Sequence, residues 1–488
     1  MDRRVITRRE FVTAGAGAAA LLVGGRTLDA LAAVGADPRI KALDKVVRGP
    51  IITPGDPRYA NARLAFNTRY DAIHPLAVVQ PLDVKDVQAV VNWARATGVR
   101  IAARSGGHSY AGYSTSPGVV LDLSRLRGVA LDGASRAVVG PGARLGAVYE
   151  ALGAKGKAIS GGTGATVGVG GLVLGGGFGL ASRSWGLASD NLVSVQIVTA
   201  DGKVLVADAG HHADLFWACR GGGGGNFGVA TRFVLKTHAV SSGSWFVATF
   251  PWAETEAVLA QFLSWAPHAP DALGSICRLA AGPGGPTIQV FGQYLGTEVA
   301  LKSLLAGLQG GVVPTKLVTG TAPWLDLVRR WAGCLGKPLA TCPAPRTSFA
   351  AGSAYFDRVP TSAQLTPFRQ AIEARGSQSG AILVDAYGGA VGRVAPAATA
   401  FPHRHELASV QVFAVGPATP TRAWVKATRA AVKPAVSGGA YVNYIDPDLK
   451  DWQRAYYGAN LARLEKVKRR YDPKNLFRFA QSIPRAKP

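Results

Sequence analysis

His108 is the side chain of this sequence best placed for covalent chemistry, because it directly follows two glycines, Gly106 and Gly107. Glycine lets the backbone approach a ligand closely, so the imidazole that follows can meet that ligand. As a nucleophile toward an electrophilic carbon, an imidazole nitrogen forms a stable C–N bond. We therefore interpret His108 as a candidate tether for a cofactor.

The glycines of the sequence are concentrated around this histidine. Glycine supplies 61 of 488 residues, whereas the usual share is about 7%. Successive N–H groups in glycine turns form concave sites for anions, and a pyrophosphate is a natural guest. Tight turns alone would explain any one cluster, but four clusters within 125 residues favour a ligand: 105–108, 160–171, 175–179 and 221–228.

The sequence lacks the motifs of several other classes of cofactor-binding protein and enzyme. The G-x-G-x-x-G pattern at 223–228 follows an expected helix and precedes an expected strand, the reverse of a Rossmann fingerprint. No Gly-Lys pair is followed by Ser or Thr, so no P-loop is predicted. The stretch 107–111 ends in alanine where a serine hydrolase elbow needs glycine. Neither the cysteines nor the histidines have zinc-ligand spacing, so we predict no metal site.

The elements that would position these loops are mixed. Apolar periodicity predicts a helix over 84–97 with Gly98 as its stop, followed by a strand over 99–103. Period-two alternation predicts strands over 192–198 and 229–235, the first of them turning back through a tight hairpin. Residues 50–240 therefore indicate an α+β domain rich in glycine loops.

A separate domain is predicted over 241–440. It has short apolar runs, connectors rich in Pro and Gly, and six of the ten tryptophans. These tryptophans would suit either sugar stacking or an ordinary core. The chain then closes with an amphipathic helix that carries Leu464 and Tyr471 on one stripe and stops at Asp472.

The N-terminus resembles an export signal. Arg8 and Arg9 precede a short Gly/Ala-rich apolar run, and small residues favour cleavage near Ala32. We interpret residues 1–36 as a twin-arginine signal, which suits a protein that folds around a cofactor before export. We therefore expect an exported protein that uses the twin-arginine machinery and has no transmembrane anchor after cleavage. A basic tail before a linker is the alternative.

Charge and cysteine content set further bounds. The 54 Lys and Arg against 30 Asp and Glu give a net charge of +24, which permits nucleic acid, acidic polymers or a membrane surface as partners. The basic residues are dispersed rather than clustered with aromatics, so we predict no specific nucleic-acid binding. Cys334 and Cys342 are close enough in sequence for a disulfide in an oxidising compartment.

The segment RSGGHSYAGYS at 104–114 resembles the flavin-attachment loop of the berberine bridge enzyme-like flavoproteins, within the vanillyl-alcohol oxidase superfamily. The resemblance continues in order through three more segments and covers roughly 74–240 and 440–484: 167–192, 214–229 and 456–484. The middle of the chain matches weakly.

The resemblance implies an α+β fold of two domains. A bipartite PCMH-type FAD-binding domain would use residues 50–240 and a C-terminal segment, 441–488. A substrate domain at 241–440 would hold an antiparallel sheet backed by helices. His108 would carry a covalent link to FAD, and the other residues in contact with the cofactor would be Arg104, Ser105, Gly106, Gly107, Ser109, Gly164, Val167, Gly168, Gly170, Gly171, Gly175, Gly176, Gly177, Gly179, Asp190, Asn191, Gly228, Val229 and Asn475.

Two of these positions carry separate information. Many relatives have a second tether, a cysteine, at the position of Gly164, so the resemblance implies single attachment through His108. Val167 corresponds to the position that gates oxygen, where valine goes with oxidases and leucine with dehydrogenases. This favours O2 as electron acceptor, although an ordinary buried valine would look the same.

An alcohol oxidised by a flavin loses a proton from oxygen and a hydride from carbon, so a base must reach the hydroxyl. Tyr444 resembles the catalytic tyrosine of the family, and Tyr110 and Gln411 resemble its polar partners. No glutamate aligns near Gln411, which argues against a carboxylate base there. With an ordinary pKa of about 10, the tyrosine would need stabilisation as a phenolate.

These features predict an exported oxidase that uses FAD and O2, releases H2O2 and acts on a small alcohol or hemiacetal, either a carbohydrate or a secondary metabolite. Two alternatives stay open. One is a flavin dehydrogenase with another acceptor. The other is a basic cell-surface binding protein whose flavin is only structural.

Overall fold

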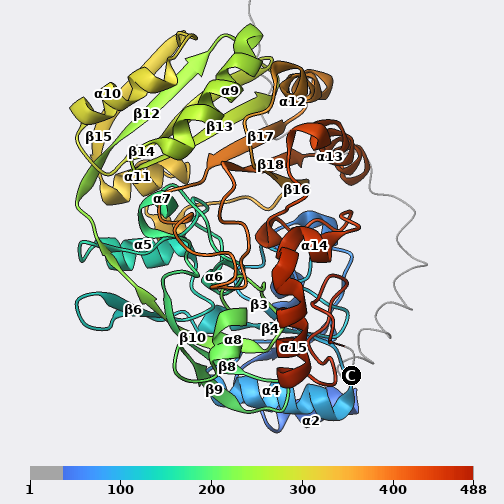
Figure 1. The fold of residues 1–488 in the computed structure, drawn as a ribbon. Coiled ribbons are helices and arrows are strands. Elements are labelled where there is room, and N and C mark those ends of the chain that lie inside the picture. The colour runs from blue at the N-terminus through green and yellow to red at the C-terminus, as the bar shows by residue number, and fades with distance from the viewer. Residues whose placement is uncertain (1–36, 487–488) are drawn as a thin grey trace, which may run out of the picture.

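The computed structural model describes residues 37–486. The predicted export signal at 1–36, with its cleavage site near Ala32, lies outside the described residues. Figure 1 shows two bodies, a lower one that holds the N-terminal half of the chain and an upper one built on a large sheet. Within the described residues, no helix is long and apolar enough to cross a membrane.

The first sheet of the lower body packs against one long helix. Helix α4 (Val84–Thr97) begins at the N-cap Asp83 and ends at Gly98, whose φ of 71° needs a glycine. Its side chains Val87 and Val91 are fully buried against the sheet. Both boundaries of this helix were predicted and are confirmed. The sheet has the order β1 (Ile51–Ile52), β2 (Ala77–Val79), β4 (Val119–Asp122), β3 (Ile101–Arg104).

A second, antiparallel sheet completes the lower body. The strands expected over 192–198 and 229–235 are confirmed as its central pair, and the expected hairpin leads into β9. Its order is β5 (Val129–Leu131), β6 (Arg136–Val139), β10 (Val229–Lys236), β8 (Leu192–Val198), β9 (Val204–Ala207).

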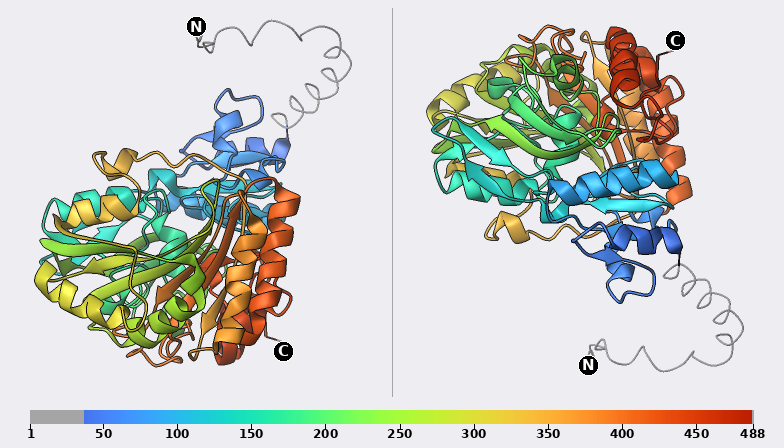
Figure 2. Two further views of the ribbon diagram at one scale, coloured as in Figure 1. Left: turned by 90° about the horizontal axis from the view of Figure 1, so that it is seen from above. Right: turned by 90° about the horizontal axis from the view of Figure 1, so that it is seen from below.

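The upper body is a seven-stranded antiparallel sheet with helices on one face. Figures 1 and 2 show α9 (Thr255–Trp265), α10 (Glu298–Leu308), α12 (Ser362–Arg375) and α13 (Ala418–Val432) over that face. Alternate strand residues such as Phe246, Leu279 and Val384 are buried beneath them. The strand order is β15 (Lys316–Pro323), β12 (Ser242–Phe250), β14 (Thr287–Tyr294), β13 (Leu273–Ala281), β17 (Gly380–Ala386), β18 (Ala408–Val415), β16 (Phe349–Phe356). The predicted α+β class is confirmed.

The end of the chain returns to the lower body. Helix α15 (Leu461–Tyr471) packs beside α8 (Ala213–Ala218), as Figure 1 shows. Lys468 is fully buried there and donates to Asp472 at 2.7 Å and to the Asn226 carbonyl at 2.7 Å. Because a buried ammonium is costly unless it is fully paired, this network fixes the C-terminal segment to the glycine loop of residues 221–228.

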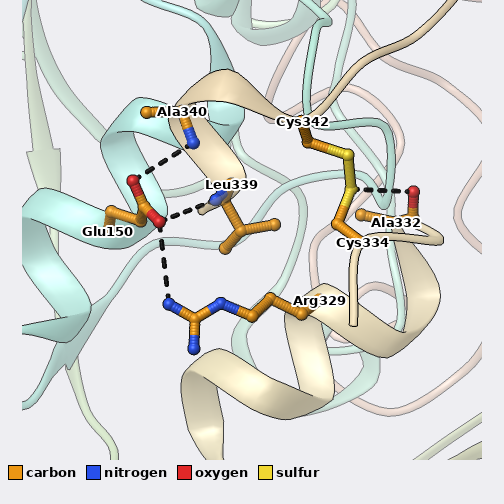
Figure 3. The surroundings of a disulfide bond; sticks show 7 residues. All are labelled: Glu150, Arg329, Ala332, Cys334, Leu339, Ala340 and Cys342. Carbon is orange, nitrogen blue, oxygen red and sulfur yellow. Dashed lines mark hydrogen bonds and ion pairs between the residues drawn. A yellow bond between two sulfur atoms is a disulfide. The ribbon is translucent and has the colours of Figure 1, made fainter. Parts of the chain in front are cut away.

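A strap of residues 332–348 runs from α11 (Trp324–Trp331) of the upper body across the lower body to β16. Figure 3 shows the Cys334–Cys342 disulfide, which closes a turn of this strap. Glu150 of α5 (Leu145–Gly153) accepts from the backbone N–H of Leu339 at 2.6 Å and of Ala340 at 3.1 Å. The strap therefore ties the two bodies together.

Candidate functional site

A cavity of about 420 Å³ lies where the two bodies and the C-terminal segment meet. Its first side, which we call the sheet wall, consists of Ile276 from β13, Asp385 from β17 and Gln411 from β18. The C-terminal segment adds Tyr444. Its second side, which we call the glycine wall, consists of Gly106, Gly107, Gly162, Gly164, Gly168, Gly170, Gly171, Gly179, Gly223, Gly224, Gly225 and Gly228.

Two loops of the glycine wall touch through their backbones. A Cβ atom added at Gly106 would lie 2.3 Å from the backbone nitrogen of Gly168, and one added at Gly168 would lie 2.0 Å from that of Gly106. The N–H of Gly170 donates to Ser105 Oγ at 3.2 Å. Backbone must move before either Gly106 or Gly168 can carry a side chain, so packing alone requires these two glycines.

Packing does not require a glycine at position 171. It lies in α6 (Val169–Leu174), no atom lies within 4 Å of the position of an added Cβ, and it lines the cavity. Alanine is more favourable than glycine in a helix by about 1 kcal/mol. An added methyl group would only take room from the cavity. The glycine wall therefore fits a ligand that lies directly against backbone, as expected for FAD.

His108 lies at the edge of the glycine wall, where one residue stacks on its ring and another hydrogen-bonds to a ring nitrogen. It stacks on Phe66 with 4.0 Å between the ring centroids, and its Nε2 lies 3.0 Å from Thr166 Oγ1. Burial, together with the positive charge of Arg144, lowers the pKa of His108 to about 4. The imidazole is therefore neutral near pH 7 and keeps the lone pair that a nucleophile needs.

The structure brings together most of the residues predicted to contact the cofactor. Seven of them do not line the cavity: Arg104, Gly175, Gly176, Gly177, Asp190, Asn191 and Asn475. Arg104 pairs with Asp122 at 2.9 Å, and Asp190 pairs with the buried Arg404 at 2.8 Å. These two side chains have structural partners of their own, and their contact with a cofactor stays a prediction.

The three predicted catalytic residues come together at the far end of the cavity. Gln411 Nε2 donates to Tyr110 Oη at 2.8 Å, and the rings of Tyr110 and Tyr444 stack 5.5 Å apart at 7°. Burial raises the pKa of both tyrosines well above the ordinary value. Both phenols are therefore protonated at neutral pH. The stabilised phenolate that a tyrosine base would need is disfavoured at Tyr444 by burial.

Asp385 is a functional candidate that no sequence pattern singled out. On β17, Ile382 and Val384 point into the helix-covered core, and strand alternation turns Asp385 to the cavity. Burial raises the pKa of its carboxyl to about 7, and its charge in turn raises the pKa of Tyr444. The sequence signal that could have identified it is a single acidic residue within the apolar run 381–387.

Gly164 and Val167 both line the cavity. An added Cβ at Gly164 would meet only the Val167 side chain, at 3.0 Å, so a side chain at this position needs little rearrangement. Within residues 37–486, no group of three or more His, Cys, Asp or Glu is placed to hold a metal ion.

Family models match two parts of the chain, an FAD binding domain at residues 75–208 and the segment called berberine and berberine like at 440–484. The chain is 33% identical to the uncharacterised FAD-linked oxidoreductase YgaK of Bacillus subtilis, over 89% of this chain and 97% of that protein. It is 32% identical to the chitooligosaccharide oxidase of Gibberella zeae, over 89% and 92%.

The fold is also similar to a solved structure. Berberine bridge enzyme-like protein 1 of Physcomitrella patens superposes with a TM-score of 0.85 at 33% identity, covering 92% of this chain and all of that one. The resemblance and the PCMH-type fold inferred from motifs are therefore confirmed. The residues of the glycine wall, together with His108, would hold the FAD.

Proposed function

The chain belongs to the berberine bridge enzyme-like family of FAD-linked oxidoreductases, and we propose that it is an exported oxidase of an alcohol or hemiacetal carbon in a sugar or oligosaccharide. One observation carries the proposal: a buried acid, Asp385, and the tyrosine pair Tyr110 and Tyr444 face the glycine wall across a single cavity. The similarity to a chitooligosaccharide oxidase supports the sugar as donor.

Bound FAD would supply the acceptor for the two electrons that leave the alcohol. The protein would handle the proton. Tyr444 would accept the hydroxyl proton of the substrate at Oη and pass its own proton to the Asp385 carboxylate, which lines the same cavity and whose charge acts on this phenol. A neutral tyrosine can do this as a relay, so the chemistry needs no phenolate. The Gln411 amide holds Tyr110 in place at 2.8 Å, and Tyr110 orients the Tyr444 ring by stacking on it.

We propose a single covalent link, through His108. A neutral, oriented imidazole at the glycine wall supports this link. Gly164 offers no sulfur for a second one, and Cys219 and Cys277 are buried in the two cores. Val167 lines the cavity, and valine takes up less of its space than leucine would, which supports O2 as acceptor and H2O2 as product. Export rests on the sequence of residues 1–36.

The test begins with the colour of the purified protein. We expect yellow protein whose colour stays in the pellet after acid precipitation, and yellow supernatant for His108→Ala. His211→Ala, which removes an exposed imidazole, is the matched control. Flavin released from wild-type protein, or mass mapping that finds a flavinylated cysteine, would contradict the single histidyl link.

The second step is anaerobic titration with a panel of sugars and alcohols. At least one carbohydrate should bleach the flavin, and O2 should restore the colour with H2O2 as product. Yellow protein that no compound bleaches would favour the structural-flavin alternative. Reoxidation by O2 that is slower than turnover with an artificial acceptor would favour a dehydrogenase.

A further inference from the structure

A segment that precedes the glycine loops lies against the candidate tether. Residues 62–71, which we call the clamp segment, come before the part of the chain that matches the FAD binding domain, 75–208. Phe66 of this segment stacks on the His108 ring with an angle of 18° between the planes. His108 lines the cavity and Phe66 does not, so the stack supports the imidazole from outside the cavity.

One hydrogen bond acts at the edge of the stacked ring. Thr166 Oγ1 lies 3.0 Å from Nε2 of His108, so Nδ1 is the ring nitrogen that is left for a cofactor. Turning the imidazole over would break this hydrogen bond, and tilting it would break the stack on Phe66. The two contacts together therefore hold the ring in one orientation.

The clamp segment is joined to the loop that carries the histidine. The N–H of Phe66 donates to the Gly107 carbonyl at 3.0 Å, one residue before His108. The buried Arg104, at the start of the same loop, donates through Nη1 to the Leu64 carbonyl at 3.3 Å. Each of the two segments thus donates to the other, which fixes the position of the phenyl ring relative to the imidazole.

The upper body holds the other side of the clamp segment. Asn67 is buried, and its amide donates to the Phe349 carbonyl at 3.0 Å and accepts from the Phe349 N–H at 3.3 Å. Arg346, in the strap, donates to the Ala65 carbonyl at 2.6 Å. Because Ala65 and Asn67 flank Phe66 in the chain, the strap and the start of β16 determine where the phenyl ring lies.

We propose that Phe66 is a positioning residue for the covalent attachment of FAD, and that the strap and β16 act on the tether through it. This inference rests on the proposed link through His108. Attachment forms one C–N bond and removes one hydrogen from the imidazole and one from a methyl group of the cofactor. The two protons and two electrons released by these changes reduce the flavin, and O2 then accepts them as H2O2. The nitrogen must be held against one carbon atom, which a freely rotating imidazole would seldom reach.

The test measures how much flavin stays with the protein after acid precipitation, as a fraction of the total flavin. Phe66→Leu keeps an apolar side chain but removes the flat ring. Its attached fraction should fall about tenfold, since a misplacement of about 1 Å can slow a reaction about 100-fold. Phe66→Tyr keeps the ring and should restore attachment. The total flavin should stay close to that of wild-type protein in both variants.

Phe291→Leu is the matched control, because Phe291 is a half-buried phenylalanine of the upper body that stacks on Trp331 away from the cavity. Its attached fraction should equal that of wild-type protein. Arg346→Gln removes the guanidinium that donates to the Ala65 carbonyl. It should lower the attached fraction by less than Phe66→Leu does, because the other contacts of the clamp segment remain.

Arg358→Gln, at an exposed arginine just beyond the other end of β16, is the control for Arg346→Gln and should attach its flavin normally. Complete attachment in Phe66→Leu would overturn the inference. A parallel fall in total flavin, attached flavin and melting temperature would also overturn it, because it indicates a structural role. If wild-type protein itself releases its flavin, the proposed histidyl link is wrong and the inference falls with it. The assay needs no substrate, so a wrong assignment of the sugar would not alter its result.

Discussion

The two walls of the cavity are built in opposite ways. The glycine wall is made of backbone, from loops that lie within 125 residues of sequence, and close approach dictates several of its residues. The sheet wall is made of side chains from three strands, and the pairing of β13 with β17 brings together Ile276 and Asp385, which are more than 100 residues apart. Its strands would pair equally well with other side chains on the face that lines the cavity.

The difference separates two kinds of specificity. Where two backbone segments are in contact, few side chains are tolerated, so the shape of the glycine wall and its fit to a ligand are fixed. A strand side chain that faces the cavity has free space on one side, so its replacement requires fewer adjustments of neighbouring atoms than a side chain added at Gly106 or Gly168. We therefore expect substitutions in the glycine wall to lower flavin content and stability. Substitutions on the opposite side should lower the rate of flavin reduction while the protein keeps its flavin.

The broadest effect, on both the fold and the flavin, is expected in the glycine wall. Gly106→Ala places a Cβ 2.3 Å from the Gly168 nitrogen, and overpacking of this kind costs about 1–3 kcal/mol or more. The yield of flavin-loaded protein should fall at least about tenfold, measured by absorbance per milligram. Gly128→Ala, at an exposed glycine with open space around it, is the control and should load normally. Normal flavin loading in Gly106→Ala would remove the contrast between the walls.

The next effect is expected opposite the glycine wall. Tyr444→Phe keeps the ring that stacks on Tyr110 and removes the hydroxyl that relays the proton. The rate of anaerobic flavin reduction should fall about 100- to 1,000-fold, as for loss of a general base, with flavin content unchanged. Stopped-flow absorbance measures both. Unchanged reduction kinetics would rule out the relay.

Asp385→Asn should change the pH dependence of both rate and stability. Because burial raises the pKa of this carboxyl to about 7, the carboxylate that accepts the proton forms as the pH rises through about 7. Flavin reduction should accelerate over that range in wild-type protein, and Asp385→Asn should be slower by about tenfold and lack this acceleration. A variant that keeps the acceleration would show that another group titrates.

The stability effect of Asp385 has a definite sign. Its pKa is higher in the folded than in the unfolded chain, so its contribution is complete below about pH 4 and is lost as the pH rises through about 7. Asp385→Asn should therefore raise the melting temperature at pH 8 by a few degrees, roughly what 1–2 kcal/mol gives in a protein of this size. Thermal unfolding at pH 4 and pH 8 measures the difference.

The smallest effect sharpens the comparison within the glycine wall itself. Gly171→Ala meets no atom within 4 Å and lies in a helix, so the melting temperature of the flavin-free protein should stay the same or rise. Flavin occupancy should still fall several-fold, because the methyl group enters the cavity. Full occupancy would show that this glycine serves neither packing nor ligand.

Local pattern predicted much of the lower body. The helix over 84–97 and the strands over 192–198 and 229–235 were found with boundaries within a residue, because caps, glycine stops and alternation act over a few residues. The pattern did not distinguish glycines that face the ligand from glycines that contact another part of the chain. Gly177 belongs to a cluster attributed to the ligand, yet its N–H donates to Tyr441 Oη at 2.8 Å, a partner from the C-terminal segment.

The sequence by itself determined the family and the FAD-binding fold and predicted the tether, because these depend on backbone freedom and on one imidazole within short runs of residues. The tertiary structure decided what faces the flavin. Asp385 is an ordinary charged residue in an apolar strand until the register of the sheet turns it to the cavity that Tyr444 also lines. Contacts between residues so far apart in the chain depend on the packing of whole sheets, which no short pattern encodes.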